Sequence, residues 1–190
     1  MKKTVKADIS LSVDGTATAS LMDQLSLVPN VPSFTKKDPT NRRLTLSHLG
    51  SVPFQHLSIA HERLAILVKS IPRTLFTFEK FGITHIRGQG YIVALATPAR
   101  GQDEWTDFVR LLRVQMHKRV AGTNRPLAEF ADDRTWIPMV VLGKLDARSQ
   151  TSAWEARLHT SIIFCARKIA LYLKVRDGTE SVTYSNPFEI

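Results

Sequence analysis

Cysteine and long apolar segments are scarce in this sequence. Cys165 is the only cysteine, so the chain can form neither an internal disulfide nor a zinc site built from several cysteines. Within the apolar stretch SIIFCARK, we expect Cys165 to be buried as a small hydrophobic residue. No apolar run reaches the roughly 20 residues of a membrane-spanning helix, and the opening MKKTVKADISLSVDG alternates where a signal peptide would be continuously apolar. We therefore expect a cytoplasmic protein with no membrane partner.

Acidic residues are also in deficit. The 190 residues include 17 Asp and Glu against 26 Lys and Arg, which gives a net charge of +9. This balance favours a partner that carries phosphate. Hydrophobic residues make up 43% of the chain and charged residues 23%, which is typical of a globular protein and excludes extensive disorder. Because no segment resembles a linker, the sequence predicts a single domain over residues 1–190.

Strand-like and helix-like patterns succeed one another along the chain, which predicts an α+β fold. Alternation and apolar runs bounded by turns predict strands over 5–13, 44–49, 73–86, 91–97, 137–144, 168–175 and 181–188. Helices are predicted over 19–27, 55–71, 103–120 and 151–164. The segment 33–43 is predicted to be a polar, basic loop.

Two strand segments that lie about half the chain length apart resemble each other. RRLTLSHLG and IPMVVLGKL each follow a polar loop that contains arginine, and Arg43 and Met139 stand 96 residues apart in them (43 to 139). Matching strands at this spacing indicate two lobes related by an approximate twofold axis.

In the order of its elements, the sequence resembles the two-histidine (2H) phosphoesterase superfamily, which includes RNA 2′,3′-cyclic phosphodiesterases and 2′-5′ RNA ligases. The resemblance covers most of the chain and rests on LSVDG, RLTLSHLGSV, WIPMVVLGKL and KIALYLKVRDG; the family's strand motifs read HLTLxFLG and PHxTL. It implies two pseudo-symmetric lobes of antiparallel strands, with flanking helices, around a central groove. It also implies two histidines that act as general base and general acid on a phosphodiester, beside two Thr or Ser hydroxyls that hold phosphate oxygens.

Three of these four motif side chains are replaced. The histidine positions hold Arg43 and Met139, and the hydroxyl positions hold Thr45 and Val141. Because arginine stays protonated and methionine cannot exchange a proton, the family's reaction is not expected here. Arg43 and Thr45 instead predict a cradle for a bound phosphate, and Met139 and Val141 an apolar wall for a base or ribose. The alternative for Met139 and Val141 is that they fill a site that has lost its function.

Basic residues flank both motif strands. By pseudo-symmetry they are predicted at the groove mouth, where they attract anions: Lys36, Lys37, Arg42, Arg125 and Arg134. Trp136, beside the second motif, is a candidate for stacking on a base, with burial at the strand end as the alternative.

Two histidines are candidates for relocated acid–base groups. His85 lies at a strand end beside a hairpin turn, and His48 lies in the first motif strand. Strict alternation turns His48 away from Arg43 and Thr45. No histidine pair has the spacing of a metal site and no glycine loop has the features of a phosphate-binding loop, so neither a metal nor a cofactor is expected.

These observations favour a non-catalytic protein that binds a nucleotide or a nucleic-acid phosphate in the groove. Such a protein could sequester a nucleotide signal, for instance a cyclic nucleotide of antiviral defence. A second hypothesis is an active phosphodiesterase that uses His48 or His85. A third is a structural or protein-interaction domain, and general RNA binding is expected if the basic surface acts without the groove.

Overall fold

A nine-stranded antiparallel sheet organises the chain. The computed structural model describes residues 4–38, 42–72, 75–86, 88–99, 101–123, 125–127, 135–147, 153–177 and 180–189. The strands follow the order β7-β4-β5-β6-β3-β1-β8-β9, and the short β2 pairs with β6 outside this path. Their bounds are β1 Thr4–Ser12, β2 Phe34–Lys36, β3 Arg43–Pro53, β4 Leu75–Ile86, β5 Gln89–Pro98, β6 Met139–Leu145, β7 Glu155–Cys165, β8 Lys168–Asp177 and β9 Glu180–Glu189. The helices are α1 Gly15–Ser26, the short 3₁₀ turn Phe54–His56, α2 Leu57–Val68 and α3 Gln102–His117.

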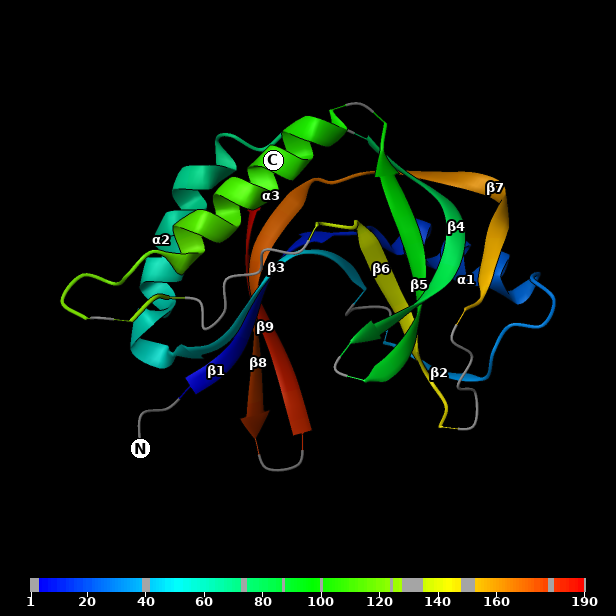
Figure 1. The fold of residues 1–190 in the computed structure, drawn as a ribbon, viewed down its shortest axis with the longest axis horizontal. Helices are drawn as coiled ribbons and strands as arrows, with labels where there is room; N and C mark the ends of the chain where they lie inside the picture. The colour runs from blue at the N-terminus through cyan, green and yellow to red at the C-terminus, as the bar shows by residue number, and fades with distance from the viewer. Residues whose placement is uncertain are drawn as a thin grey trace.

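The sheet consists of two four-stranded lobes that meet at its centre (Figure 1). The first lobe contains β3, β1, β8 and β9, and the second contains β6, β5, β4 and β7. The lobes join where Leu44 of β3 pairs with Val140 of β6. α2 contacts β8 and α3, α3 contacts β3 and β5, and α1 lies against β7. This arrangement confirms the predicted α+β fold of two antiparallel lobes with flanking helices.

Alternation along the strands creates the core. Ile9 and Leu11 of β1 are fully buried, as are Leu44 of β3 and Val140 of β6. They belong to one continuous apolar cluster with the inner faces of the three α-helices. Burial of one such side chain stabilises the fold by about 1.5–3 kcal/mol, so the strand pattern largely determines which face of the sheet the helices cover.

The first helix begins earlier than its apolar pattern predicts. The side chain of Asp14 accepts a hydrogen bond of 2.7 Å from the amide of Ala17, which makes Asp14 the N-cap and starts α1 at Gly15. The longest helix, α3, has 16 residues. Among the described residues, no helix combines the length and apolar character needed to cross a membrane.

The internal repeat is confirmed by a matching irregularity in the two lobes. In the β1–β3 ladder, Leu46 is passed over, because Thr45 and Ser47 pair with consecutive residues of β1. Leu142 is passed over in the same way in the β5–β6 ladder. The two leucines are 96 residues apart (46 to 142), which is the predicted spacing. Each marks a β-bulge, which shifts the side chains beyond it to the other face of the strand.

The helix predicted over 151–164 is wrong, because its described part forms the edge strand β7. Alternate apolar side chains of β7 turn toward the core, among them Ile162 and Phe164. The ring of Phe164 stacks on Phe76 and Phe78 of β4, with centroids 5.2 and 5.1 Å apart. Pairing with β4 therefore decides the conformation of a segment that is rich in β-branched residues.

The prediction of a buried Cys165 is also wrong. Cys165 is the last residue of β7 and is exposed. Its neighbour Phe164 takes the buried position, because successive side chains of a strand point to opposite faces.

Gly143 of β6 allows β2 to pair closely with that strand. A Cβ atom at Gly143 would lie 2.6 Å from the carbonyl oxygen of Thr35 and would overlap the ring of Phe34. We expect Gly143→Ala to lower the free energy of unfolding by about 1–3 kcal/mol, the usual cost of overpacking, as measured by urea denaturation. Gly82→Ala is the matched control, since its Cβ would meet Leu95 at an ordinary 3.8 Å. Equal losses in the two variants would contradict this account.

Candidate functional site

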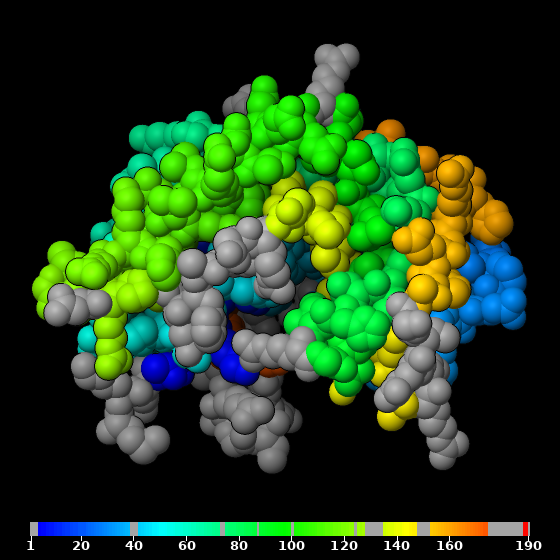
Figure 2. All heavy atoms as spheres, viewed as in Figure 1, coloured from blue at the N-terminus to red at the C-terminus, as the bar shows by residue number. Residues whose placement is uncertain are grey.

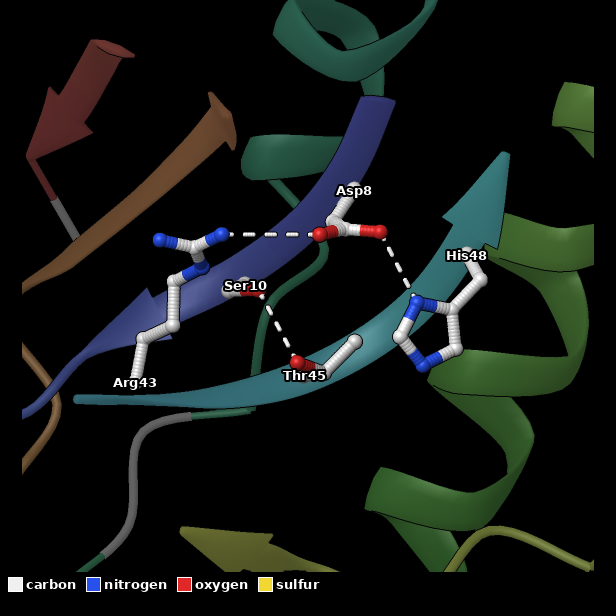
Figure 3. Close-up of polar contacts among 5 residues, drawn as sticks. All are labelled: Asp8, Ser10, Arg43, Thr45 and His48. Atoms are coloured by element: carbon white, nitrogen blue, oxygen red, sulfur yellow. Dashed lines mark hydrogen bonds and ion pairs between the residues drawn. The ribbon is translucent and has the colours of Figure 1, made fainter. Parts of the chain in front are cut away.

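The polar face of the first lobe lies at the centre of the molecule. Asp8 and Ser10 of β1 alternate with the buried core residues, and Arg43 and Thr45 of β3 share their face. The hydroxyl of Ser10 donates to that of Thr45 at 3.4 Å (Figure 3). Figure 2 shows the molecule hollowed at this place, where atoms of β1 and β3 lie deep among the surrounding segments. We call this side of the sheet the groove face; the opposite side packs against the helices.

Arg43 is held in place from two sides. Its Nη2 lies 3.5 Å from Oδ2 of Asp8, and its guanidinium carbon lies 4.2 Å from the ring centroid of Tyr172. Its side chain is only 13% exposed, and Nη1 is buried without a hydrogen-bond partner among the described residues. A buried polar group without a partner is costly, so Nη1 is the atom of Arg43 at which an added acceptor would stabilise the site most.

His48 lies on the groove face, so the expectation that it turns away from Arg43 and Thr45 is wrong. The bulge at Leu46 changes the alternation, and His48 consequently pairs with Asp8. Nδ1 of His48 donates to Oδ1 of Asp8 at 2.8 Å (Figure 3). Asp8 therefore bridges Arg43 and His48, one carboxylate oxygen to each.

The carboxyl of Asp8 is ionised at neutral pH. Burial raises its pKa, but the hydrogen bond and charge of His48 and the charge of Arg43 outweigh burial, so the pKa lies below its usual value. Asp8 was not among the predicted site residues, although the alternation of β1 places it on the accessible side. The missing information was which residue of β3 pairs with it.

Met139 and Val141 line the groove face of the second lobe. Leu44 of β3 pairs with Val140 of β6. The residues that flank this pair therefore lie on one face of the sheet: Arg43, Thr45, Met139 and Val141. Met139 pairs with Leu95 and Val141 with Val93, and both motif residues are half-buried. The second lobe thus presents an apolar wall at the positions where the first lobe presents Arg43 and Thr45.

Two predicted ligand contacts serve the fold instead. Trp136 is 9% exposed, lies 5.9 Å from Trp105 between ring centroids, and donates its indole N–H to the carbonyl oxygen of Thr45 at 3.1 Å. Arg42 is buried and donates to the carbonyl oxygens of Thr18 and Lys37 at 3.3 and 3.0 Å. The indole N–H of Trp136 and both terminal nitrogens of Arg42 are thus engaged by backbone carbonyl groups, while Nε of Arg42 is buried without a partner among the described residues.

Two other predicted residues, His85 and Arg125, are not brought to the site. His85 pairs with Gly90, which places it on the opposite face of the sheet from Val141, so the prediction that it reaches the groove is wrong. Arg125 lies in the turn that follows α3, where Arg63 of α2 donates to nearby carbonyl groups. Arg134 lies outside the described residues.

Lys37 was predicted at the groove mouth, but it lies near enough to Arg43 for their charges to interact. Its segment, predicted as a loop, contains β2, and the amide of Lys37 donates to the carbonyl oxygen of Leu142 at 2.8 Å. Burial, followed by the charge of Arg43, lowers the pKa of Lys37 to about 8. Lys36, the preceding residue, is exposed.

Comparisons with known proteins identify the architecture. No protein-family model matches the sequence, and no curated protein is detectably similar to it. Among solved structures, the chain is similar to a phosphoesterase with a TM-score of 0.66 and 13% identity over 99% of both chains. It is similar to LigT of E. coli complexed with 3′-AMP, with a TM-score of 0.65 and 13% identity over 99% of both chains. For TT0787 of Thermus thermophilus the TM-score is 0.64, with 15% identity over 97% of both chains.

The likeness extends over nearly the whole of each chain and includes the paired lobes that carry the site. At such low identity it establishes the architecture of the chain. The chain therefore has the LigT-like fold of the 2H phosphoesterases.

Proposed function

We propose that the groove binds the phosphate of a nucleotide or a nucleic acid and does not cleave it by the two-histidine reaction. The observation that carries this proposal is the state of Arg43, whose guanidinium is fixed by Asp8 and Tyr172 while Nη1 has no partner among the described residues. A fixed guanidinium binds phosphate well, since little side-chain freedom is lost on binding. The structurally similar LigT of E. coli has been crystallised with ATP, 3′-AMP and phosphate.

The two lobes have complementary roles in this proposal. Arg43 and Thr45 supply donors to the phosphate oxygens, and Met139 and Val141 supply apolar contacts to a base or ribose. Sites for small molecules commonly combine an apolar wall with a few polar groups that fix the orientation of the ligand. Met139 and Val141 also lack any group that exchanges protons, which removes one of the two proton-transfer groups from this side of the groove.

Titration calorimetry with ATP, 3′-AMP and 2′,3′-cyclic AMP tests the proposal. We expect at least one of them to bind with a Kd below about 100 μM, corresponding to more than about 5.5 kcal/mol. Mass spectrometry of the supernatant released by heat from freshly purified protein then identifies any nucleotide that the protein retains. If none of the three nucleotides binds below about 1 mM, the proposal is wrong.

Sequestration is the biological role that a non-cleaving binder of this kind fits. A nucleotide signal of antiviral defence is one ligand of this class. Incubation of such a nucleotide with an excess of protein, followed by heat release, should return it chemically unchanged. Recovery of a hydrolysed product would exclude sequestration.

A second candidate function is supported by the contact between His48 and Asp8. A carboxylate that accepts a hydrogen bond from one ring nitrogen orients an imidazole for proton transfer at the other. His48 lies on the same face as Thr45, so a phosphodiesterase with one relocated histidine is chemically possible. The hydrolysis experiment in the Discussion distinguishes the two functions.

A further inference from the structure

Three cations from different segments surround the single carboxylate of Asp8. Arg43 of β3 contacts Asp8 directly at 3.5 Å. Lys174 of β8 lies on the groove face two residues beyond Tyr172, which pairs with Asp8. Lys37 follows β2 and is held there by its amide, which donates to β6. We call Lys37, Arg43 and Lys174 the cation cluster.

The charges of the other two cations act on Lys37. Burial, together with the charges of Arg43, Lys174 and Arg42, lowers the pKa of Lys37 to about 8, whereas Asp8 raises it. Lys6 and His48 lie on the same face and add no negative charge. Burial lowers the pKa of Arg42, and the charge of Asp38 partly opposes this effect.

Among the residues that the structure describes around Asp8, the positive charges therefore outnumber the negative ones. Three cations face one carboxylate, and Arg42 is already used by two backbone carbonyl groups. Lys37 and Arg43 are half-buried and Lys174 is exposed. Cations that repel one another are stabilised by an anion, and the stabilisation grows with the charge of that anion. At neutral pH a phosphate monoester carries a charge of about −1.5 to −2, whereas a phosphodiester carries a single negative charge.

We propose that the cation cluster makes the groove selective for a phosphate monoester, such as the terminal phosphate of a nucleotide, over a cyclic or internal phosphodiester. This inference rests on the proposed function, because it concerns the same site. A monoester also offers three terminal oxygens, so Arg43, Thr45 and Lys37 can each bind one. Lys37 determines this selectivity, since burial and the neighbouring charge of Arg43 both disfavour its charged form when no anion is bound.

The selectivity is measured with two nucleotides that share the same base. Titration calorimetry at pH 7.5 should show 3′-AMP binding at least about 10-fold more tightly than 3′,5′-cyclic AMP, as expected for one additional charge-assisted contact. Lys37→Met should weaken the binding of 3′-AMP and leave cyclic AMP nearly unchanged, so the ratio of the two affinities approaches one. Lys36→Met is the matched control, because Lys36 is exposed on β2, and it should leave the ratio unchanged.

The charge of Lys37 predicts a pH dependence with a definite sign. Lys37 loses its proton as the pH rises through about 8, while the phosphate of 3′-AMP is already fully charged. The affinity for 3′-AMP should therefore fall between pH 7 and 9, and binding at pH 8 should take up protons, seen as a buffer-dependent enthalpy. Lys37→Arg should keep the affinity and remove both effects, since arginine stays charged throughout this range.

The outcomes separate this inference from the proposed function. If neither nucleotide binds, the proposed function is wrong and this inference falls with it. If cyclic AMP binds as tightly as 3′-AMP, or if Lys37→Met leaves their ratio unchanged, only the inference is wrong. Far-UV circular dichroism of each variant verifies that it is folded, which is expected because the backbone of Lys37 makes its contacts in every variant.

Discussion

We expect no detectable hydrolysis of 2′,3′-cyclic nucleotides or of short 2′-5′-linked oligonucleotides at neutral pH. The two-histidine reaction needs a general base and a general acid, and these positions hold Arg43 and Met139. Each proton-transfer group contributes a factor of roughly 10²–10⁴ to the rate, so the loss of both reduces the rate by at least about that factor. Chromatography of the products after prolonged incubation with a large excess of substrate measures the residual rate.

Turnover in this assay would favour the second candidate function. The decisive variant is His48→Ala, because His48 is hydrogen-bonded to Asp8 on the groove face. His85→Ala is its matched control, since His85 pairs with Gly90 on the opposite face of the sheet. Hydrolysis that His48→Ala abolishes and His85→Ala preserves would show that the groove is catalytic.

The second large effect is expected at Arg43. A hydrogen bond to a charged group contributes about 1.5–3 kcal/mol, so Arg43→Ala should weaken nucleotide binding by roughly 10- to 150-fold. Arg43→Lys should also lose affinity, because an ammonium group offers neither the planar fork nor the same contact with Tyr172. Titration calorimetry with a nucleotide that the parent protein binds gives both values.

A matched control distinguishes the loss of the contact between Arg43 and the phosphate from the loss of one positive charge. Lys36→Ala removes one positive charge from an exposed position of β2. It should change the association rate and its salt dependence while the dissociation rate stays nearly constant, as expected for a charge that attracts anions without contacting them. Stopped-flow measurements resolve the two rates. If Arg43→Ala binds as tightly as the parent protein, the phosphate cradle is not formed by Arg43.

Much of the fold can be predicted from local patterns. Alternation over 5–13 predicts β1 to within one residue at each end, and the apolar spacing after Trp105 predicts α3. The repeat of 96 residues that relates Arg43 to Met139 corresponds to equivalent strands, down to the bulges at Leu46 and Leu142. These features are predictable because each depends on neighbours in the sequence or on a copied segment.

The errors have a common physical origin. The described part of 151–164 forms β7 because β4 offers it a partner, and Cys165 is exposed because alternation along β7 gives the buried position to Phe164. His48 reaches the groove face because the ladder with β1 omits Leu46. Trp136 is buried because the ring of Trp105 lies beside it. Each outcome depends on a partner that is distant in the sequence, which a local pattern does not include.

The sequence by itself determined which chemistry is absent from the motif positions. Arg43 and Met139 cannot exchange protons at neutral pH in any fold, since this property belongs to the side chains themselves. Only the tertiary structure decided what surrounds Arg43: Asp8 and Tyr172 hold it, and Lys37 lies within reach of its charge. The physical reason is that strand pairing and bulges set the face on which a side chain lies, and both are fixed by contacts between segments that the sequence keeps far apart.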